Sequence, residues 1–248
     1  MWWIAAVGMA CAACGHVGFS GNDGSDATAS ADVATSDAAD SSLLFHYTLD
    51  ELSNTTTLDS VSARPAQCPT AGQCPTPVTG RIGGALEFSA SDELQIAFDS
   101  ALYTPSAYTI TAWAFPTTGV DGSLFAWPAM SATTVWNTWQ LEQVGGLASF
   151  TTSDTTSGND KMTGTALPVS TWTHVAGVWD GATKRLYVNG VEVAAKPWTV
   201  YLEDTEPMLI GADNNDGADG LFYPAELDDI RLYSRALSAP EVAALASQ

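Results

Sequence analysis

The stretch Trp172–Ala195, WTHVAGVWDGATKRLYVNGVEVAA, decides the fold, because apolar and polar residues alternate in it with a period of two. This period is typical of β-strands, whose successive side chains point to opposite faces of a sheet. Asp180-Gly181 predicts a turn after the first segment. Asn189-Gly190 predicts a type I′ hairpin turn after the second, since these residues tolerate the positive φ required there. We therefore expect three short strands joined by tight turns.

The composition agrees with a turn-rich β protein and limits the partners. The 248 residues include 9 Trp, 21 Gly and 12 Pro, and 46% are hydrophobic, which is enough for one core of all-β size. The formal net charge is −20, from 28 acidic and 8 basic residues. This balance argues against nucleic acid, whose phosphates need Lys and Arg, and against attraction to anionic lipid headgroups. It favours solubility in an extracellular medium, with a few carboxylates left as candidate calcium ligands.

The first residues predict export. Residues 1–14 are apolar and end in Ala12-Ala13-Cys14, which resembles the lipobox of bacterial lipoprotein precursors and implies a signal peptide with Cys14 acylated. Cys11 is the alternative acylation site. The run lacks the basic residue that usually precedes it, so an ordinary cleaved signal peptide is a second alternative. The resemblance implies a bacterial cell-envelope protein that is lipid-anchored, or else secreted, and that contacts a membrane only through the anchor.

The composition then changes twice along the chain. Residues 15–41 are rich in Gly, Ser, Ala and Asp, and predict a disordered acidic tether, because they bury too little apolar surface to fold. Residues 42–248 predict the folded domain, with further strands at 44–51, 84–88 and 108–116. The tail predicts a short helix, with Ser238 as N-cap and Glu241 at the capping-box spacing.

These blocks together resemble one known family. A first strand that ends in Asp50-Glu51, the entry Gly80-x-x-Gly-Gly-Ala-Leu, the strand Thr109-Ile-Thr-Ala-Trp, the opening stretch and Leu227-Asp-Asp-Ile-Arg-Leu-Tyr follow one another as in bacterial laminin-G-like domains of the concanavalin A-like superfamily. The resemblance implies a jelly-roll β-sandwich of two antiparallel sheets over residues 42–248. It also implies a recognition module that binds carbohydrate or mediates adhesion, and the alternative is a structural or protein–protein adhesion domain.

Cys68 and Cys74 predict a local disulfide, because two cysteines this close in an exported protein most simply pair with each other.

Calcium is the one cofactor that the sequence suggests. The candidate ligands are Asp50, Asp59, Asp228 and Asp229, which the resemblance brings together at one edge of the sandwich. Asp228 is in phase with Ile230 and should point inward, where it needs a metal ion or an arginine as partner. A hydrogen-bonded or ion-paired aspartate is therefore the alternative to calcium.

A catalytic role is not expected. Glycosidases of this superfamily carry Glu-x-Asp-x-x-Glu along one strand, and here Glu226-Leu227-Asp228 is followed by Ile230 and Arg231. A retaining mechanism needs two carboxyl groups about 5–5.5 Å apart, and this strand lacks the second one. We therefore expect a binding protein and not an enzyme.

Aromatic residues are the candidate ligand contacts. Trp136, Trp139 and Trp198 are not assigned to the core by the pattern, and indole rings stack on the apolar faces of sugars. The expected partner is thus a glycan or, alternatively, a surface protein. The sequence indicates neither the ligand nor the oligomeric state.

Overall fold

A computed structural model describes residues 40–131, 134–154, 158–202, 204–215 and 218–248, and of 130, 131, 134–136 and 215 it describes the backbone alone. The expected signal peptide, nearly all of the expected tether, Cys11, Cys14 and the side chain of Trp136 lie outside the described residues. In the described part of the chain, no helix is long and apolar enough to cross a membrane.

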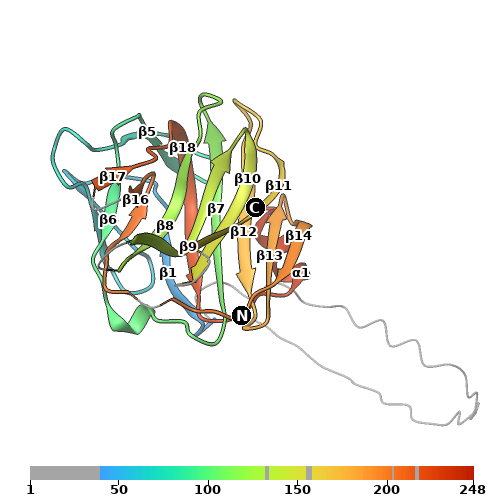
Figure 1. Cartoon of the computed structure of the whole chain (residues 1–248). Coiled ribbons are helices and arrows are strands. Elements are labelled where there is room, and N and C mark those ends of the chain that lie inside the picture. Colours follow the sequence, from blue (N-terminus) through green and yellow to red (C-terminus); the bar gives the residue numbers. More distant parts are fainter. Residues whose placement is uncertain (1–39, 132–133, 155–157, 203, 216–217) are drawn as a thin grey trace, which may run out of the picture. The chain divides into compact units, whose positions relative to one another are not determined.

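Almost all regular structure in the described residues is strand (Figure 1). The strands are β1 (Leu43–Tyr47), β2 (Thr56–Leu58), β3 (Pro65–Gln67), β4 (Thr76–Thr79), β5 (Gly84–Phe88), β6 (Leu94–Ile96), β7 (Tyr108–Pro116), β8 (Gly122–Ser131), β9 (Thr134–Val144), β10 (Leu147–Asp154), β11 (Gly158–Ala166), β12 (Thr173–Trp179), β13 (Thr183–Val188), β14 (Val191–Pro197), β15 (Met208–Ile210), β16 (Asp213–Asn215), β17 (Ala218–Gly220) and β18 (Ala225–Tyr233). A 3-10 helix, η2 (Ser100–Leu102), and an α-helix, α1 (Ala239–Leu245), accompany them.

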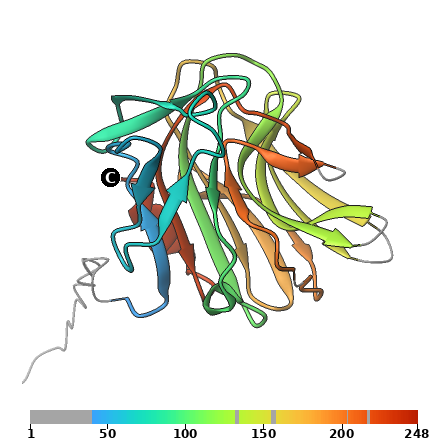
Figure 2. The same cartoon turned by 90° about the vertical axis from the view of Figure 1, so that its left-hand side faces the viewer.

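Two antiparallel sheets form the sandwich. Sheet A has the order β14-β13-β12-β7-β18-β5-β4, and β1 also pairs with β18. Sheet B has the order β11-β10-β9-β8-β15-β6-β3-β2, and β16 and β17 form a separate hairpin. The 90° view shows the two layers lying against each other (Figure 2). The predicted all-β jelly-roll sandwich with a short C-terminal helix is therefore confirmed.

The opening stretch forms β12, β13 and β14 at one side of sheet A. Its hairpin turn has positive φ at both central residues, 48° at Asn189 and 77° at Gly190, as the dipeptide predicts. Gly190 also lies against α1, since a Cβ there would come within 2.8 Å of the Cα of Ala243. The turn thus requires glycine for two independent reasons.

The core lies between the sheets, and α1 closes a second apolar layer on the outside of sheet A. In β1, Phe45 and Tyr47 are fully buried in the main core. Ala176 and Val178 of β12 face the other way and pack with Val242 of α1, which explains why both faces of β12 are buried. The helix begins with the predicted capping box of Ser238 and Glu241.

Candidate functional site

A hollow that carries polar groups lies on the outer face of sheet B, the face turned away from sheet A. Leu94 and Ile96 of β6 and Ala66 of β3 belong to the core, so Gln95 and Gln67 between and beside them point outward. The backbone register pairs Gln67 directly with Gln95. Two carboxamides from strands that are distant in the sequence are thereby brought side by side.

These carboxamides line a pocket of about 500 Å³, which we call the sheet B pocket. Its other walls are apolar and come from three separate segments of the chain. The lining residues are Pro65, Gln67, Cys68, Pro69, Gln95, Ala97, Phe98 and Pro207. The ring of Phe98 is 37% exposed, which leaves part of it accessible to a ligand, and it rests against Tyr103 with 5.4 Å between the ring centroids. The pocket thus combines an apolar wall with a few polar groups, as small-molecule sites commonly do.

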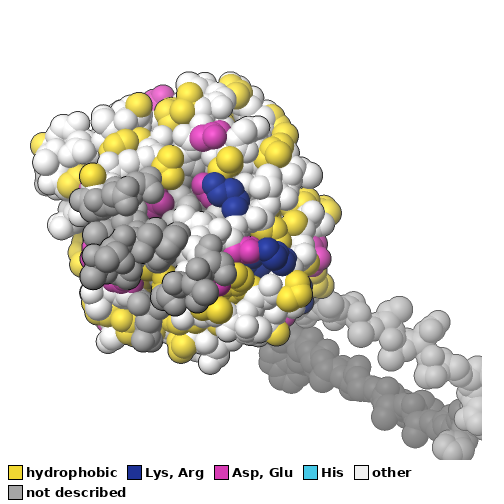
Figure 3. All heavy atoms as spheres, in the orientation of Figure 1, with side chains coloured by type: hydrophobic (Ala, Val, Ile, Leu, Met, Phe, Trp, Pro, Cys, Tyr) yellow, Lys and Arg dark blue, Asp and Glu magenta, His cyan; other side chains and the backbone are white. Residues whose placement is uncertain are grey.

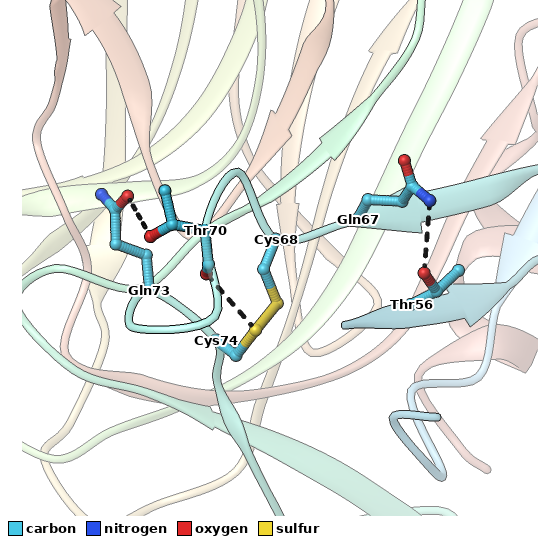
Figure 4. Close-up of a disulfide and its surroundings, with 6 residues drawn as sticks. All are labelled: Thr56, Gln67, Cys68, Thr70, Gln73 and Cys74. Atoms are coloured by element: carbon cyan, nitrogen blue, oxygen red, sulfur yellow. Dashed lines mark hydrogen bonds between the residues drawn. A yellow bond between two sulfur atoms is a disulfide. The ribbon is translucent and has the colours of Figure 1, made fainter. Parts of the chain in front are cut away.

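The predicted disulfide forms part of the rim. Cys68 is bonded to Cys74, and Figure 4 shows this bond just beyond the end of β3, with the Gln67 side chain pointing away from it toward Thr56. Gln67 donates from Nε2 to the hydroxyl of Thr56 on β2, over 3.3 Å. The covalent loop therefore fixes the backbone at the point where Cys68 and Pro69 enter the pocket wall.

Two carboxylates hold Gln95 from behind the pocket. Its Nε2 donates to Oε1 of Glu93 at 2.9 Å and to Oδ2 of Asp219 at 3.4 Å. Glu93 is fully buried, and its Oε2 has no hydrogen-bond partner. Burial, together with the negative charge of Asp219, raises the pKa of Glu93 to about 7. The amide group of Gln95 is thus directed at the protein, and its carbonyl oxygen is left for a ligand.

A second polar cluster lies on β9 of the same sheet, and its side chains are buried. Asn137 donates to Oδ2 of Asp213 at 3.1 Å and to Gln140 at 3.3 Å. Burial raises the pKa of Asp213 to about 7, and the negative charges of Glu142 and Asp219 add to the effect. Asp213 is 1% exposed and Glu142 3%. In this structure both carboxylates are therefore buried side chains.

The four calcium candidates separate into two groups. Asp59 and Asp229 are occupied by protein donors. The Asp59 carboxylate accepts from the backbone of Val61, Ser62 and Arg64 within one turn, and Asp229 binds His46 and Arg231. Protein donors thus already satisfy both carboxylates, and calcium ligation by the four-carboxylate set stays a prediction.

Asp50 and Asp228 do lie at one loop, between β4 and β5. Oδ1 of Asp50 accepts from the amide of Gly84 at 2.6 Å, and Oδ2 of Asp228 accepts from the amide of Ile82 at 2.8 Å. Gly83 has a φ of 71°, and a Cβ there would be 2.4 Å from Oδ1 of Asp50. The Gly-Gly pair of the motif therefore allows the carboxylate to approach the backbone this closely.

Asp228 retains an oxygen without a partner. Its side chain is fully buried, and Oδ1 accepts no hydrogen bond. Burial raises its pKa to about 7, and the nearby charges of Asp229 and Asp50 contribute. In the described residues, no group of three or more His, Cys, Asp or Glu is placed to bind a metal ion. The carboxylate oxygens of Asp50 and Asp228 are of the type that Ca²⁺ prefers.

A β-bulge explains how both adjacent aspartates are buried. The register of β18 against β7 shifts between Asp228 and Arg231, and Asp229 has a φ of 53°. Regular alternation would send the two side chains to opposite faces, but the bulge inserts a residue and turns Asp229 toward His46. Arg231 then binds Asp229 at 2.9 Å, while the donor to Asp228 is a backbone amide. No Gly stands at or beside Asp229, so the sequence carries no signal for this bulge.

The described tryptophan candidates are largely structural. Trp139 is 0% exposed, with its ring 4.7 Å from that of Phe125 in the core. This position corrects the expected ligand contact at Trp139, because the ring has no free face. Trp198 is half-buried and packs against the core. The Lys184 ammonium lies 5.0 Å from its ring centroid, so one face is covered.

A second carboxyl does exist opposite Glu226, but on another strand. Glu226 of β18 is the register partner of Glu87 of β5. Directly opposed side chains on antiparallel strands have their Cβ atoms about 4.5–5.5 Å apart. Partial burial and the Glu87 charge raise the pKa of Glu226. The pair could not be predicted from the sequence, because the two residues are far apart in the chain and meet only through the pairing of β5 with β18.

Comparisons with known proteins agree with this architecture. The family model described as the concanavalin A-like lectin/glucanases superfamily matches residues 88–243. No curated protein matches the sequence. Among solved structures, the binding domain of Paraclostridial Mosquitocidal Protein 1 is similar, with a TM-score of 0.64, 16% identity, and coverage of 83% of this chain and 52% of that one.

Two further structures are similar. Domain 4 of AbnA, an extracellular arabinanase from Geobacillus stearothermophilus, in complex with arabinotriose, has a TM-score of 0.64 and 20% identity over 82% of this chain and 98% of that one. Trypanosoma rangeli sialidase in complex with sialic acid has a TM-score of 0.64 and 14% identity over 83% of this chain and 32% of that one. The chain thus spans about half of the toxin domain's length and a third of the sialidase's. At these identities the likeness shows the fold alone.

Proposed function

Because the chain belongs to the concanavalin A-like lectin/glucanases superfamily, we propose that its folded domain is a non-catalytic carbohydrate-binding module whose site is the sheet B pocket. The observation that carries this proposal is the pairing of Gln67 and Gln95 beside the partly exposed ring of Phe98. Carboxamides orient sugar hydroxyls, and an aromatic ring covers the apolar face of a pyranose. The binding domains among the similar structures support the proposal by analogy only.

A glycan array followed by calorimetry tests the site. Gln95→Ala and Phe98→Ala should each weaken binding of the best glycan roughly tenfold or more, since each removes one of the contacts that fix the sugar. Val191→Ala is the matched control, because Val191 is 65% exposed on sheet A. If wild-type protein binds no glycan on the array, the proposal is wrong, and a protein-adhesion domain becomes the favoured alternative.

A glycoside hydrolase is the second candidate, and the Glu87–Glu226 pair is the observation that favours it. Two glutamates on directly opposed positions can bring their carboxyl groups to the roughly 5–5.5 Å separation that retaining glycosidases use. Release of reducing sugar from a panel of polysaccharides, lost in both Glu226→Gln and Glu87→Gln, would establish it. Absence of turnover by the wild-type protein on every glycan that it binds would exclude it.

We further propose a structural calcium ion at Asp50 and Asp228. The unpartnered, buried Oδ1 of Asp228 supports this, because a cation would satisfy it. Calcium bound there would join β1 and β18 to the loop before β5, and would contribute stability by binding only the folded state. The melting temperature of the wild type should then be higher in CaCl₂ than in EDTA. Asp228→Asn should abolish this difference, and Asp59→Asn should preserve it. Equal melting of the wild type in both conditions would refute the ion.

Display of the domain at a bacterial envelope through an acylated Cys14 also remains a proposal. It rests on the residues before Cys14 alone. Labelling of cells with a fatty-acid analogue should mark the wild-type protein and not Cys14→Ala. Label lost in Cys11→Ala instead would assign the alternative site, and no label in the wild type would leave a cleaved signal peptide.

A further inference from the structure

The hydrogen-bonding polarity of the sheet B pocket points to a class of ligand. Both of its carboxamides donate their amide groups to the protein, Gln95 to Glu93 and Asp219, and Gln67 to Thr56. Their carbonyl oxygens have no donor among the described residues. A carboxamide oxygen can only accept hydrogen bonds. Gln95 uses both of its amide hydrogens in these bonds, and Gln67 uses one of two. The polar side chains of the lining therefore present mainly acceptors, and a ligand must supply most of the donors.

The charges around the pocket also disfavour an anionic ligand. No Lys or Arg is among its lining residues. Arg64, which precedes Pro65, is bound to Asp99 at 2.7 Å. Glu93 and Asp219 lie directly behind Gln95, and Glu206 precedes Pro207. On the face that Figure 3 shows, basic side chains are also sparse. An anionic group in the pocket would thus meet acceptor oxygens and carboxylates.

We infer that the pocket selects uncharged, hydroxyl-rich sugars and rejects sugars that carry a carboxylate or sulfate. This inference rests on the proposed carbohydrate-binding function and adds the substrate class. Hydroxyls of a neutral sugar donate to the carbonyl oxygens of Gln67 and Gln95. A sialic or uronic acid places a negative charge against these acceptors and gains no compensating cation.

Glu93 and Asp219 act as positioning residues in this scheme. They fix the Gln95 carboxamide so that its carbonyl oxygen faces the pocket. Replacing Glu93 by Gln would offer Gln95 a donor as well as an acceptor, so the carboxamide could rotate and present its amide group. We expect Glu93→Gln to weaken neutral glycans and to relax the rejection of acidic ones.

Matched pairs of glycans test the inference. Lactose and 3′-sialyllactose, and xylotriose and its glucuronic acid derivative, are compared on the array and then by calorimetry at low and high salt. We expect the acidic member of each bound pair to be at least about tenfold weaker, with a smaller gap at high salt because screening weakens the repulsion.

Two lysine variants assign the effect to this pocket. Gln67→Lys introduces a cation among the lining residues and should narrow the gap between neutral and acidic glycans. Gln73→Lys is the matched control, because Gln73 lies close by, in the loop closed by Cys68 and Cys74, but outside the lining (Figure 4). Glu51→Gln controls for the charge lost in Glu93→Gln, since Glu51 is exposed and lies outside the lining.

The outcomes separate the two proposals. Acidic glycans that bind as tightly as their neutral counterparts would overturn the inference and leave carbohydrate binding intact. An equal effect of Gln67→Lys and Gln73→Lys would overturn the assignment to this pocket. No binding of any glycan by the wild type would overturn the proposed function itself.

Discussion

The pH dependence of stability should be set in part by Asp213. Its ordinary pKa of 3.8 is raised to about 7 in the folded state. The folded protein therefore keeps a proton that the unfolded chain has lost, and stability falls as pH rises from about 4 to about 7. Asp213→Asn replaces the carboxyl by a neutral group of the same shape. The Oδ1 of Asn137, which has no partner, can then accept from the new amide after a carboxamide rotation.

The magnitude follows from linkage. One pKa unit corresponds to 1.36 kcal/mol, and the pH interval from 5 to the raised value of about 7 covers two units. Relative to the wild type, Asp213→Asn should thus gain stability between pH 5 and pH 8 by about 3 kcal/mol at most. Relaxation around the ionised carboxylate reduces this, and we expect about 1 to 3 kcal/mol.

Urea denaturation at pH 5 and pH 8, at constant ionic strength, measures the effect. His174 titrates in the opposite sense, because burial lowers its pKa to about 4, so its contribution removes stability as the pH falls below 6.5. Both proteins retain His174, and the difference between variant and wild type isolates Asp213. Glu51→Gln, at an exposed carboxylate, should show no such pH dependence. A variant whose advantage is the same at both pH values would refute the reasoning.

Other predictions concern packing and covalent structure. Trp139→Ala should destabilise the domain by about 3–5 kcal/mol, because the ring is fully buried, whereas Trp198→Ala should cost clearly less; equal losses in denaturant titrations would contradict this. Reducing Cys68–Cys74 should cost about 2 kcal/mol, since the loop is short, and an unchanged melting temperature with dithiothreitol would count against it. Glu241→Ala should cost about 1 kcal/mol through loss of the capping box, measured by urea titration at pH 7. The cost should be much smaller at pH 2, because the Arg235 hydrogen bond lowers the pKa of this carboxyl to about 2 and it is then about half protonated.

Local signals in the sequence predict the strands, turns and helix well. The Asn189-Gly190 turn and the Ser238–Glu241 capping box need only a few adjacent residues, and both occur as expected. The Cys68–Cys74 pair is equally local, and the structure contains it. Such features are encoded by a few residues close together in the sequence and do not depend on which strands become neighbours.

The site could not be predicted in the same way, because it depends on long-range register. Gln67 and Gln95 become partners only when β3 pairs with β6. The bulge at Asp229 is held by His46 from β1, so nothing near Asp229 in the sequence indicates it. Trp139 faces the core in a strand pair with a register shift after Trp127, and the alternation alone does not determine that face.

The recognisable sequence motif and the proposed binding residues lie in different sheets, and this separation has an evolutionary consequence. The stretch 172–195, by which the chain is identified, lies in sheet A, whereas the proposed binding residues lie in sheet B and in the loop closed by Cys68 and Cys74. Mutations can therefore remodel ligand preference without touching the residues that mark descent. Two proteins that share the motif can have diverged completely in what they bind, and proteins with similar ligands need not be close kin.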